Sequence, residues 1–151
     1  MITTNLLYHA TYPDAEDSID DNGLLSGVNG CVSLCTFPHH AAGFINMFGC
    51  SRIIGVRHLD AWDTYKRIPD DVFITESFQS ILVYAIDTSM IDYQNVSMNA
   101  FDKSQVLRGV LPAFMQSYEY RGSIRPDALV EKYWFPKDDK HIDSCFHYSG
   151  L

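Results

Sequence analysis

The stretch LLYHAT, residues 6–11, opens the sheet that we predict for this chain of 151 residues. A short apolar run of this kind is typical of a buried strand, and we place that strand over residues 5–10. The run ends in the imidazole of His9 and the hydroxyl of Thr11. A single histidine beside apolar residues is more often a hydrogen-bonded core side chain than a functional one. The role of His9 therefore depends on the rest of the chain.

Further strands are predicted where short apolar or alternating runs end at turn residues. The clearest is ILVYAID (81–87), which is apolar almost throughout. The others are CVSLC (31–35), RIIGVRHL (52–59), 117–121 and 129–135. Residues 60–79 read as a loop with short pieces, and residues 88–103 as polar and irregular.

Two helices are predicted near the start of the chain. Residues 14–22 carry acidic side chains in their first turn and are followed by Gly23, so a short helix there would have its dipole complemented. Ile19, Leu24 and Leu25 are expected to face inward. A third, short helix is expected within residues 104–116, broken near Pro112.

The second of these helices begins at Pro38, a residue that suits the first helical position. Its apolar side chains recur at helical spacing and should face the core. They are Ala41, Phe44, Ile45 and Phe48. Together the elements predict a single domain over residues 1–151, of α+β class, with small helices packed on a split or mixed sheet.

Composition excludes several classes of protein. The chain has 11 basic and 19 acidic residues, a net charge of −8, which argues against a protein held to nucleic acid by a basic face. Its densest basic stretch, residues 52–67, is interrupted by Asp60 and Asp63 and reads as a solvated surface. No apolar run reaches membrane-spanning length, and the N-terminus lacks the pattern of a secretory signal. We expect a cytoplasmic protein without a membrane partner, acting in its own cell or in that of a host.

The four cysteines form no Cys-x-x-Cys pair, so a zinc site is not predicted. In a strand, Cys31, Ser33 and Cys35 would share one face. His39 and His40 lie close by in sequence, but the spacing favours buried free thiols over metal ligands. The other two cysteines are Cys50 and Cys145.

Three motifs in order carry more information than any one alone. The first is LYHAT (7–11), followed by NGLL (22–25). The second is GCVSLCTFPHHAAGF (30–44), and the third is YEYRGSIRPDAL (118–129), in which a strand bears Glu119. This order resembles the NAD-dependent ADP-ribosyltransferase superfamily, loosely over residues 6–48 and 81–135. The likeness extends to the polymerase-like branch, the DNA-modifying toxins and the tRNA 2′-phosphotransferases.

The resemblance implies NAD as co-substrate and a role for each matching residue. His9 would hydrogen-bond a ribose hydroxyl, the backbone of Ala10 would hold the nicotinamide carboxamide, and Thr11 would support the same pocket. Ser33 and Phe44 would also contact the cofactor, although a hydroxyl on a half-buried strand and a core phenylalanine are the ordinary interpretations of these two residues. His9 and Glu119 would be the catalytic residues.

The chemistry explains these residue types. Cleaving the bond between nicotinamide and ribose gives an oxocarbenium-like sugar, so catalysis needs orientation of the dinucleotide and a negative charge near the developing cation. Glu119 would supply that charge, bond the ribose hydroxyl and help deprotonate an acceptor. Alone, a carboxylate on a strand is usually a surface group.

Departures from the family pattern narrow the expected activity. Ala10 stands where glycine is commoner, and Ser117 stands two residues before Glu119, where arginine-directed enzymes carry Glu or Gln. We therefore expect transfer of a single ADP-ribose to a macromolecular acceptor, a host protein in preference to nucleic acid, as by a toxin or phage effector. Two alternatives stay open. One is an RNA 2′-phosphotransferase, which needs at least two arginines near His9; the other is a non-catalytic relative that binds a nucleotide or a partner protein.

Overall fold

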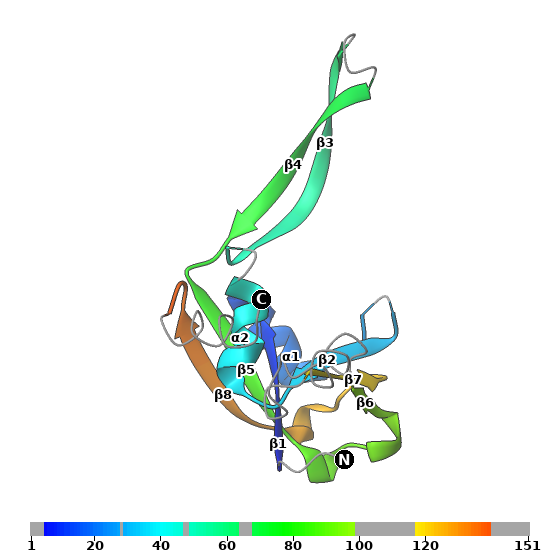
Figure 1. The fold of residues 1–151 in the computed structure, drawn as a ribbon, viewed down its shortest axis with the longest axis vertical. Helices are drawn as coiled ribbons and strands as arrows, with labels where there is room; N and C mark the ends of the chain where they lie inside the picture. Colours follow the sequence, from blue (N-terminus) through cyan, green and yellow to red (C-terminus); the bar gives the residue numbers. More distant parts are fainter. Residues whose placement is uncertain (1–4, 28, 47–48, 64–67, 99–116, 140–151) are drawn as a thin grey trace, which may run out of the picture.

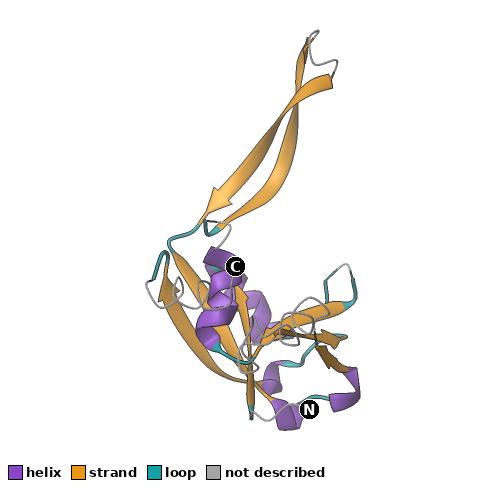
Figure 2. Cartoon of the chain, in the orientation of Figure 1, coloured by secondary structure: helices purple, strands orange, loops and turns teal. Residues whose placement is uncertain are grey.

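The computed structural model describes residues 5–27, 29–46, 49–63, 68–98 and 117–139. It is an α+β fold in which helices pack on both faces of a six-stranded sheet, and a separate two-stranded hairpin projects from the body (Figure 1 and Figure 2). The strand order in the large sheet is β6-β7-β2-β1-β5-β8. The α+β class is confirmed.

The elements follow the predicted order, with additions. The large sheet contains β1 (Leu6–Thr11), β2 (Cys31–Cys35), β5 (Ser80–Asp87), β6 (Val96–Met98), β7 (Ser117–Arg121) and β8 (Leu129–Pro136). The hairpin consists of β3 (Ser51–Asp63) and β4 (Ile68–Ser77). The helices are α1 (Glu16–Asn22) and α2 (Pro38–Asn46), with short 3-10 turns η1 (Pro13–Ala15), η2 (Thr88–Met90), η3 (Tyr93–Asn95) and η5 (Pro126–Ala128).

Strand β5 is buried on both faces, which explains its continuous apolar sequence. Leu82, Tyr84 and Ile86 pack into one core cluster, to which α1 contributes Ile19. On the opposite face, Ile81 and Val83 pack against α2. The prediction of a strand at 81–87 is confirmed because both faces of that strand are covered.

The sheet consists of two three-stranded halves, β6-β7-β2 and β1-β5-β8. They join where β1 meets β2, and that junction has a single register pair, Tyr8 with Cys35. By contrast, β1 pairs with β5 along its whole length, from Leu6 to Thr11. The sheet therefore divides at this junction. The expectation of a mixed sheet is wrong for the described strands, since each of their pairings is antiparallel.

Helix α1 ends at Asn22 and is capped by Gly23, whose φ of 79° and ψ of −167° suit glycine alone. The next residue, Leu24, exchanges two backbone hydrogen bonds with Ile124, of 2.9 and 2.8 Å. The prediction that Ile19 and Leu24 face inward is confirmed, but that for Leu25 is wrong: its side chain is 65% exposed. In this extended segment successive side chains alternate, so burying Leu24 leaves Leu25 in solvent.

Helix α2 begins at Pro38, as predicted, and packs in the core cluster on the face of the sheet opposite α1. Its buried Ala41 allows close approach to the strands, while Phe44 and Ile45 are partly buried against the same cluster. Phe48 lies outside the described residues. The helix is thus amphipathic as its spacing indicated.

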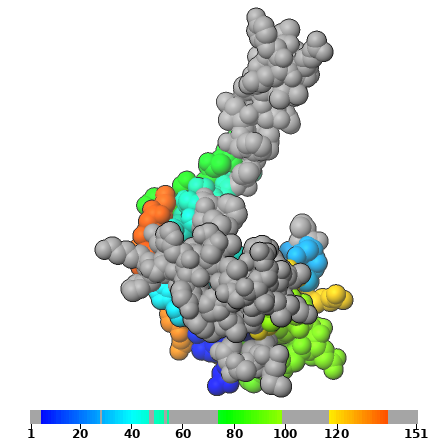
Figure 3. Space-filling view, in the orientation of Figure 1, coloured from blue at the N-terminus to red at the C-terminus, as the bar shows by residue number. Residues whose placement is uncertain are grey.

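The hairpin corrects the prediction of a loop at residues 60–79. Strands β3 and β4 pair in an antiparallel ladder from Ser51 with Ser77 to Asp63 with Ile68. Arg52 anchors its root: its guanidinium bonds Asp14 of η1 and lies 3.1 Å from Glu76, above the rings of Tyr12 and Phe78. In the space-filling view this root lies against the end of β8 (Figure 3), where the Lys137 N–H donates to the Gln79 carbonyl at 2.9 Å.

Two further predictions concern the second half of the chain. Residues 88–98 are not wholly irregular, because η2 and η3 lead into the three-residue strand β6. The helix expected within 104–116 lies outside the described residues. No helix among those described is long and apolar enough to span a membrane.

Candidate functional site

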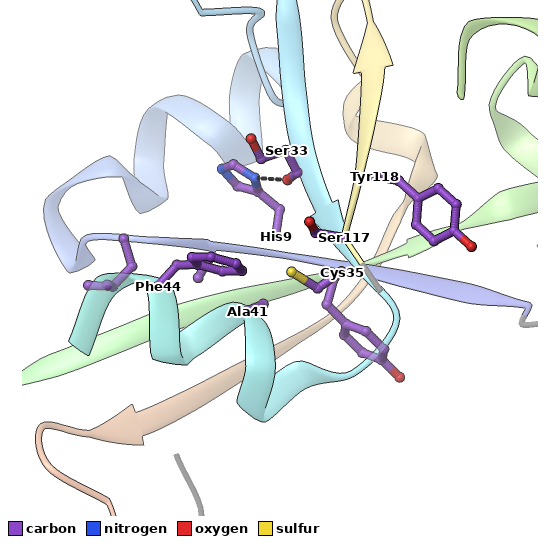
Figure 4. Close-up of a pocket in the computed structure, with 10 residues that line it drawn as sticks. His9, Ser33, Cys35, Ala41, Phe44, Ser117 and Tyr118 are labelled. Carbon is purple, nitrogen blue, oxygen red and sulfur yellow. Dashed lines mark hydrogen bonds between the residues drawn. The ribbon is translucent and has the colours of Figure 1, made fainter. Parts of the chain in front are cut away.

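A cavity of about 340 Å³ opens where the two half-sheets diverge, with α2 along one side. Its size falls within the range of small-molecule sites. Its lining is largely apolar with a few polar groups, and comes from β1, β2, α2 and β7 (Figure 4). The lining residues are Tyr8, His9, Ala10, Ser33, Cys35, Ala41, Phe44, Ile45, Ser117 and Tyr118.

His9 bridges the split. Beyond the Tyr8–Cys35 pair the ladder between β1 and β2 stops, although continued pairing would set Ala10 opposite Ser33. Instead the Nδ1–H of His9 donates to the carbonyl oxygen of Ser33 at 2.7 Å (Figure 4). An imidazole thus satisfies a carbonyl that a continuous ladder would have paired. The sequence motif that ended a strand in histidine therefore marks the point where the sheet divides.

This hydrogen bond also fixes what His9 can offer a ligand. Because Nδ1 carries the hydrogen, the neutral ring keeps a lone pair on Nε2, which can accept from a hydroxyl. Burial lowers the pKa of His9 from its ordinary value of 6.5, and the bond to the Ser33 carbonyl offsets part of that shift. His9 is therefore a neutral hydrogen-bond acceptor at physiological pH.

The lowered pKa of His9 predicts how stability depends on pH. The folded state binds fewer protons at His9 than the unfolded state, so this residue's contribution is complete above about pH 6.5 and is lost as the pH falls through the folded-state pKa. We expect the free energy of unfolding to fall more steeply between pH 7 and pH 5 in the unsubstituted protein than in His9→Gln. Urea titrations at several pH values measure this difference. Parallel pH profiles for the two proteins would contradict it.

Glu119 lies beside the cavity on the same face of the sheet. In β7, Tyr118 and Tyr120 are buried in the core cluster, so Ser117, Glu119 and Arg121 occupy the other face. The first of these three, Ser117, lines the cavity. The register pairs Glu119 with Ser33 of β2 and with Ser97 of β6. The half-buried carboxylate therefore neighbours the serine whose carbonyl receives His9, at the edge of the cavity.

The remaining predicted residues divide into two groups. Ala10, Ser33 and Phe44 line the cavity together with His9. The ring of Phe44 stacks on that of buried His40, with centroids 5.1 Å apart, and forms an apolar wall. Thr11 is not among the lining residues; it is half-buried and pairs with Leu82 of β5.

Several lining residues were missed by sequence reasoning. Cys35 and Ser117 could have been found from strand alternation, since they lie two residues from Ser33 and Glu119. Ala41 and Ile45 follow from the helical spacing of α2. No signal marked Tyr118, whose ring points away from His9 and Phe44 in Figure 4 although the residue borders the cavity.

A metal centre finds no support in the part of the chain that the structure describes. No group of three or more His, Cys, Asp or Glu side chains is placed there to hold an ion. Cys35 and Cys50 are buried. The prediction of a buried thiol is confirmed for Cys35 and wrong for Cys31, which is only half-buried. Cys145 lies outside the described residues.

Comparison with known proteins leaves the site to be interpreted from its geometry. No protein-family model matches the chain. A search of curated proteins finds no significant match. What the cavity can bind must therefore be argued from its own residues.

Proposed function

We propose that this chain is a NAD-dependent mono-ADP-ribosyltransferase that modifies a protein acceptor. One arrangement carries the proposal: the His9 imidazole is bonded to Ser33 at the split of the sheet, and Glu119 is in register with the same serine. A neutral acceptor and an apolar wall thus line one cavity. The Glu119 carboxylate is not among the lining residues, but its strand position is paired with Ser33, which is. These are the groups that a dinucleotide with ribose hydroxyls, a flat nicotinamide ring and a developing cation would require.

The residues present fit NAD in three respects. The Nε2 lone pair of His9 can accept from a ribose hydroxyl. Phe44 offers a flat apolar face, held by its stack on His40, against which a nicotinamide ring can pack. Ala10 lies on the cavity wall, where its backbone can bond the carboxamide. In place of the commoner glycine it adds only one methyl group.

Glu119 would act at the reacting carbon. As the bond between nicotinamide and ribose lengthens, positive charge grows on the sugar, and a nearby carboxylate stabilises that charge more than it stabilises bound NAD. Glu119 would also bond a ribose hydroxyl and so orient the sugar. Where the acceptor is a hydroxyl or amine, Glu119 would receive its proton.

The acceptor is inferred to be a protein, in a cytoplasm that could be that of a host cell. With a net charge of −8 the chain repels polyanions, which disfavours DNA or RNA as acceptor. The RNA 2′-phosphotransferase alternative needs arginines beside His9, and the residues that line the cavity in the described chain include none. A non-catalytic relative would bind NAD, or a partner protein, without cleaving NAD.

Two measurements test the proposal. A thermal shift with about 1 mM NAD, the upper end of ordinary KM values, should raise the melting temperature, because a ligand that binds only the folded state stabilises it. Free nicotinamide and free ADP-ribose serve as matched ligands and should give smaller shifts. Release of nicotinamide from labelled NAD then separates an enzyme from a binding protein. The proposal would be overturned if NAD produced no thermal shift and no nicotinamide were released.

A further inference from the structure

The candidate site has a cation at its outer edge. Arg121 follows Glu119 by two residues on β7 and shares its face, so their Cα atoms are about 7 Å apart along the strand. Arg121 is exposed and pairs in register with half-buried Cys31 of β2. From Ser117 in the cavity, the face therefore runs past Glu119 to a guanidinium in solvent.

The charge of Arg121 is not neutralised by the described chain. Three other described cations contact carboxylates: Arg52 bonds Asp14 and Glu76, Lys132 lies 3.1 Å from Glu16 and 2.5 Å from Asp20, and Arg125 lies 3.4 Å from Asp127. Among the described residues no carboxylate pairs with Arg121. In an acidic chain this leaves a positive group beside the candidate catalytic carboxylate, open to an anionic ligand.

We propose that Arg121 binds the acceptor, and that the acceptor group is the carboxylate of an aspartate or glutamate side chain on a protein. This inference rests on the proposed transferase function. An incoming carboxylate would be repelled by Glu119 at short range, and a guanidinium beside Glu119 offsets that repulsion. Arg121 can hold one acceptor oxygen while the other faces the sugar. Arg121 lies beyond Glu119 as seen from Ser117, at the exposed end of this face of β7.

The proposed reaction needs no general base. An acceptor carboxylate oxygen forms a bond to C1 of the nicotinamide ribose, and the C–N bond to nicotinamide breaks. The bonding pair passes to the ring nitrogen, and neutral nicotinamide leaves. No proton moves, because the acceptor is already deprotonated, so Glu119 serves only to stabilise the cationic sugar. The product is an ester of ADP-ribose.

A protein carboxylate is favoured over a nucleic-acid phosphate by the charge of the whole chain. A polyanion is repelled over a long range by a protein of net charge −8, and one arginine does not reverse that field. A single carboxylate on a neutral or basic protein surface meets no such barrier.

The test uses the full chain, labelled NAD and a cell lysate, and compares Arg121→Gln with Arg125→Gln. Arg125 is a matched control because its exposed guanidinium lies four residues away in a loop and pairs with Asp127. We expect the ratio of protein labelling to NAD hydrolysis to fall about tenfold or more in Arg121→Gln, which loses a charge-assisted hydrogen bond. In Arg125→Gln this ratio should not change. Neutral hydroxylamine should release the label, because it cleaves esters of carboxylates.

Three results would overturn the inference while leaving the proposed function intact. These are label that resists hydroxylamine, label that nuclease removes, and an unchanged labelling ratio in Arg121→Gln. Absence of nicotinamide release by the unsubstituted protein would instead overturn the proposed function itself. A thermal melt of each variant confirms that it is folded, and the exposed position of Arg121 makes loss of folding unexpected.

Discussion

Replacing Glu119 by glutamine is expected to lower kcat for nicotinamide release by about 10²–10³-fold, the cost of losing one preorganised electrostatic group. Glutamine keeps the size and most of the hydrogen bonding of the side chain but removes its charge. The carboxylate acts on the cation that forms in the transition state, so NAD binding should weaken far less than kcat falls. Steady-state release of nicotinamide, measured with the NAD-induced thermal shift, separates the two effects.

Glu131→Gln is the matched control for this experiment. It makes the same chemical change on an exposed strand, β8, where Glu131 accepts a hydrogen bond from the hydroxyl of Tyr133 and pairs in register with Ala85 and not with Ser33. Its kcat should stay within about twofold of the unsubstituted value. If Glu119→Gln retained full activity, or if both variants lost it equally, Glu119 would not be the group that stabilises the sugar cation.

Replacing Gly23 by alanine is expected to cost about 3 kcal/mol or more of folding free energy. A Cβ at this position would lie 2.0 Å from the carbonyl oxygen of Ile124, a backbone atom that cannot move aside cheaply. Overpacking costs about 1–3 kcal/mol. The backbone angles of Gly23, which only glycine adopts readily, add about 1–3 kcal/mol for any other residue. Urea denaturation followed by circular dichroism measures the loss.

Gly30→Ala separates the two contributions. Gly30 also has a positive φ, of 76°, but a Cβ there would meet nothing within 4 Å. Its substitution should therefore cost only backbone strain, about 1–2 kcal/mol. Equal losses of folding free energy in the two variants would show that the backbone near Ile124 moves aside to accept the added methyl group. A larger loss in Gly23→Ala would show that the end of α1 is pressed against the connection between β7 and β8, which follows the strand of Glu119.

Much of the fold could be predicted from local sequence, and the strands that were missed have local causes. Strands β1, β2, β5 and β7 were predicted because their apolar or alternating runs end at turn residues. Strand β4 was missed because Pro69, Asp70 and Asp71 interrupt its apolar pattern, and because its partner β3 lies in the hairpin and not in the main sheet. Strand β6 was missed because three residues are too few to show a period.

The candidate site was predictable only in part, because it depends on where distant strands stop pairing. The sequence marks His9, Ser33 and Glu119 as residues of interest, but their proximity comes from the β2–β7 register and from the end of the β1–β2 ladder. Neither follows from composition or spacing. The same register places Arg121 beyond Glu119, on the side away from Ser117. The candidate residues could therefore be predicted from the sequence, whereas their proximity became evident only from the strand pairing in the structure.

The two ends of the β3–β4 hairpin are joined at its base, and this affects which changes in the length of the chain the fold can accept. The hairpin forms a sheet of its own, and its two ends meet where the Phe78 N–H donates to the Cys50 carbonyl at 2.8 Å. Chain could be added to or removed from its far end without moving β5 or any residue that lines the cavity. We therefore expect changes in the length or composition of the hairpin to leave the geometry of the cavity unchanged.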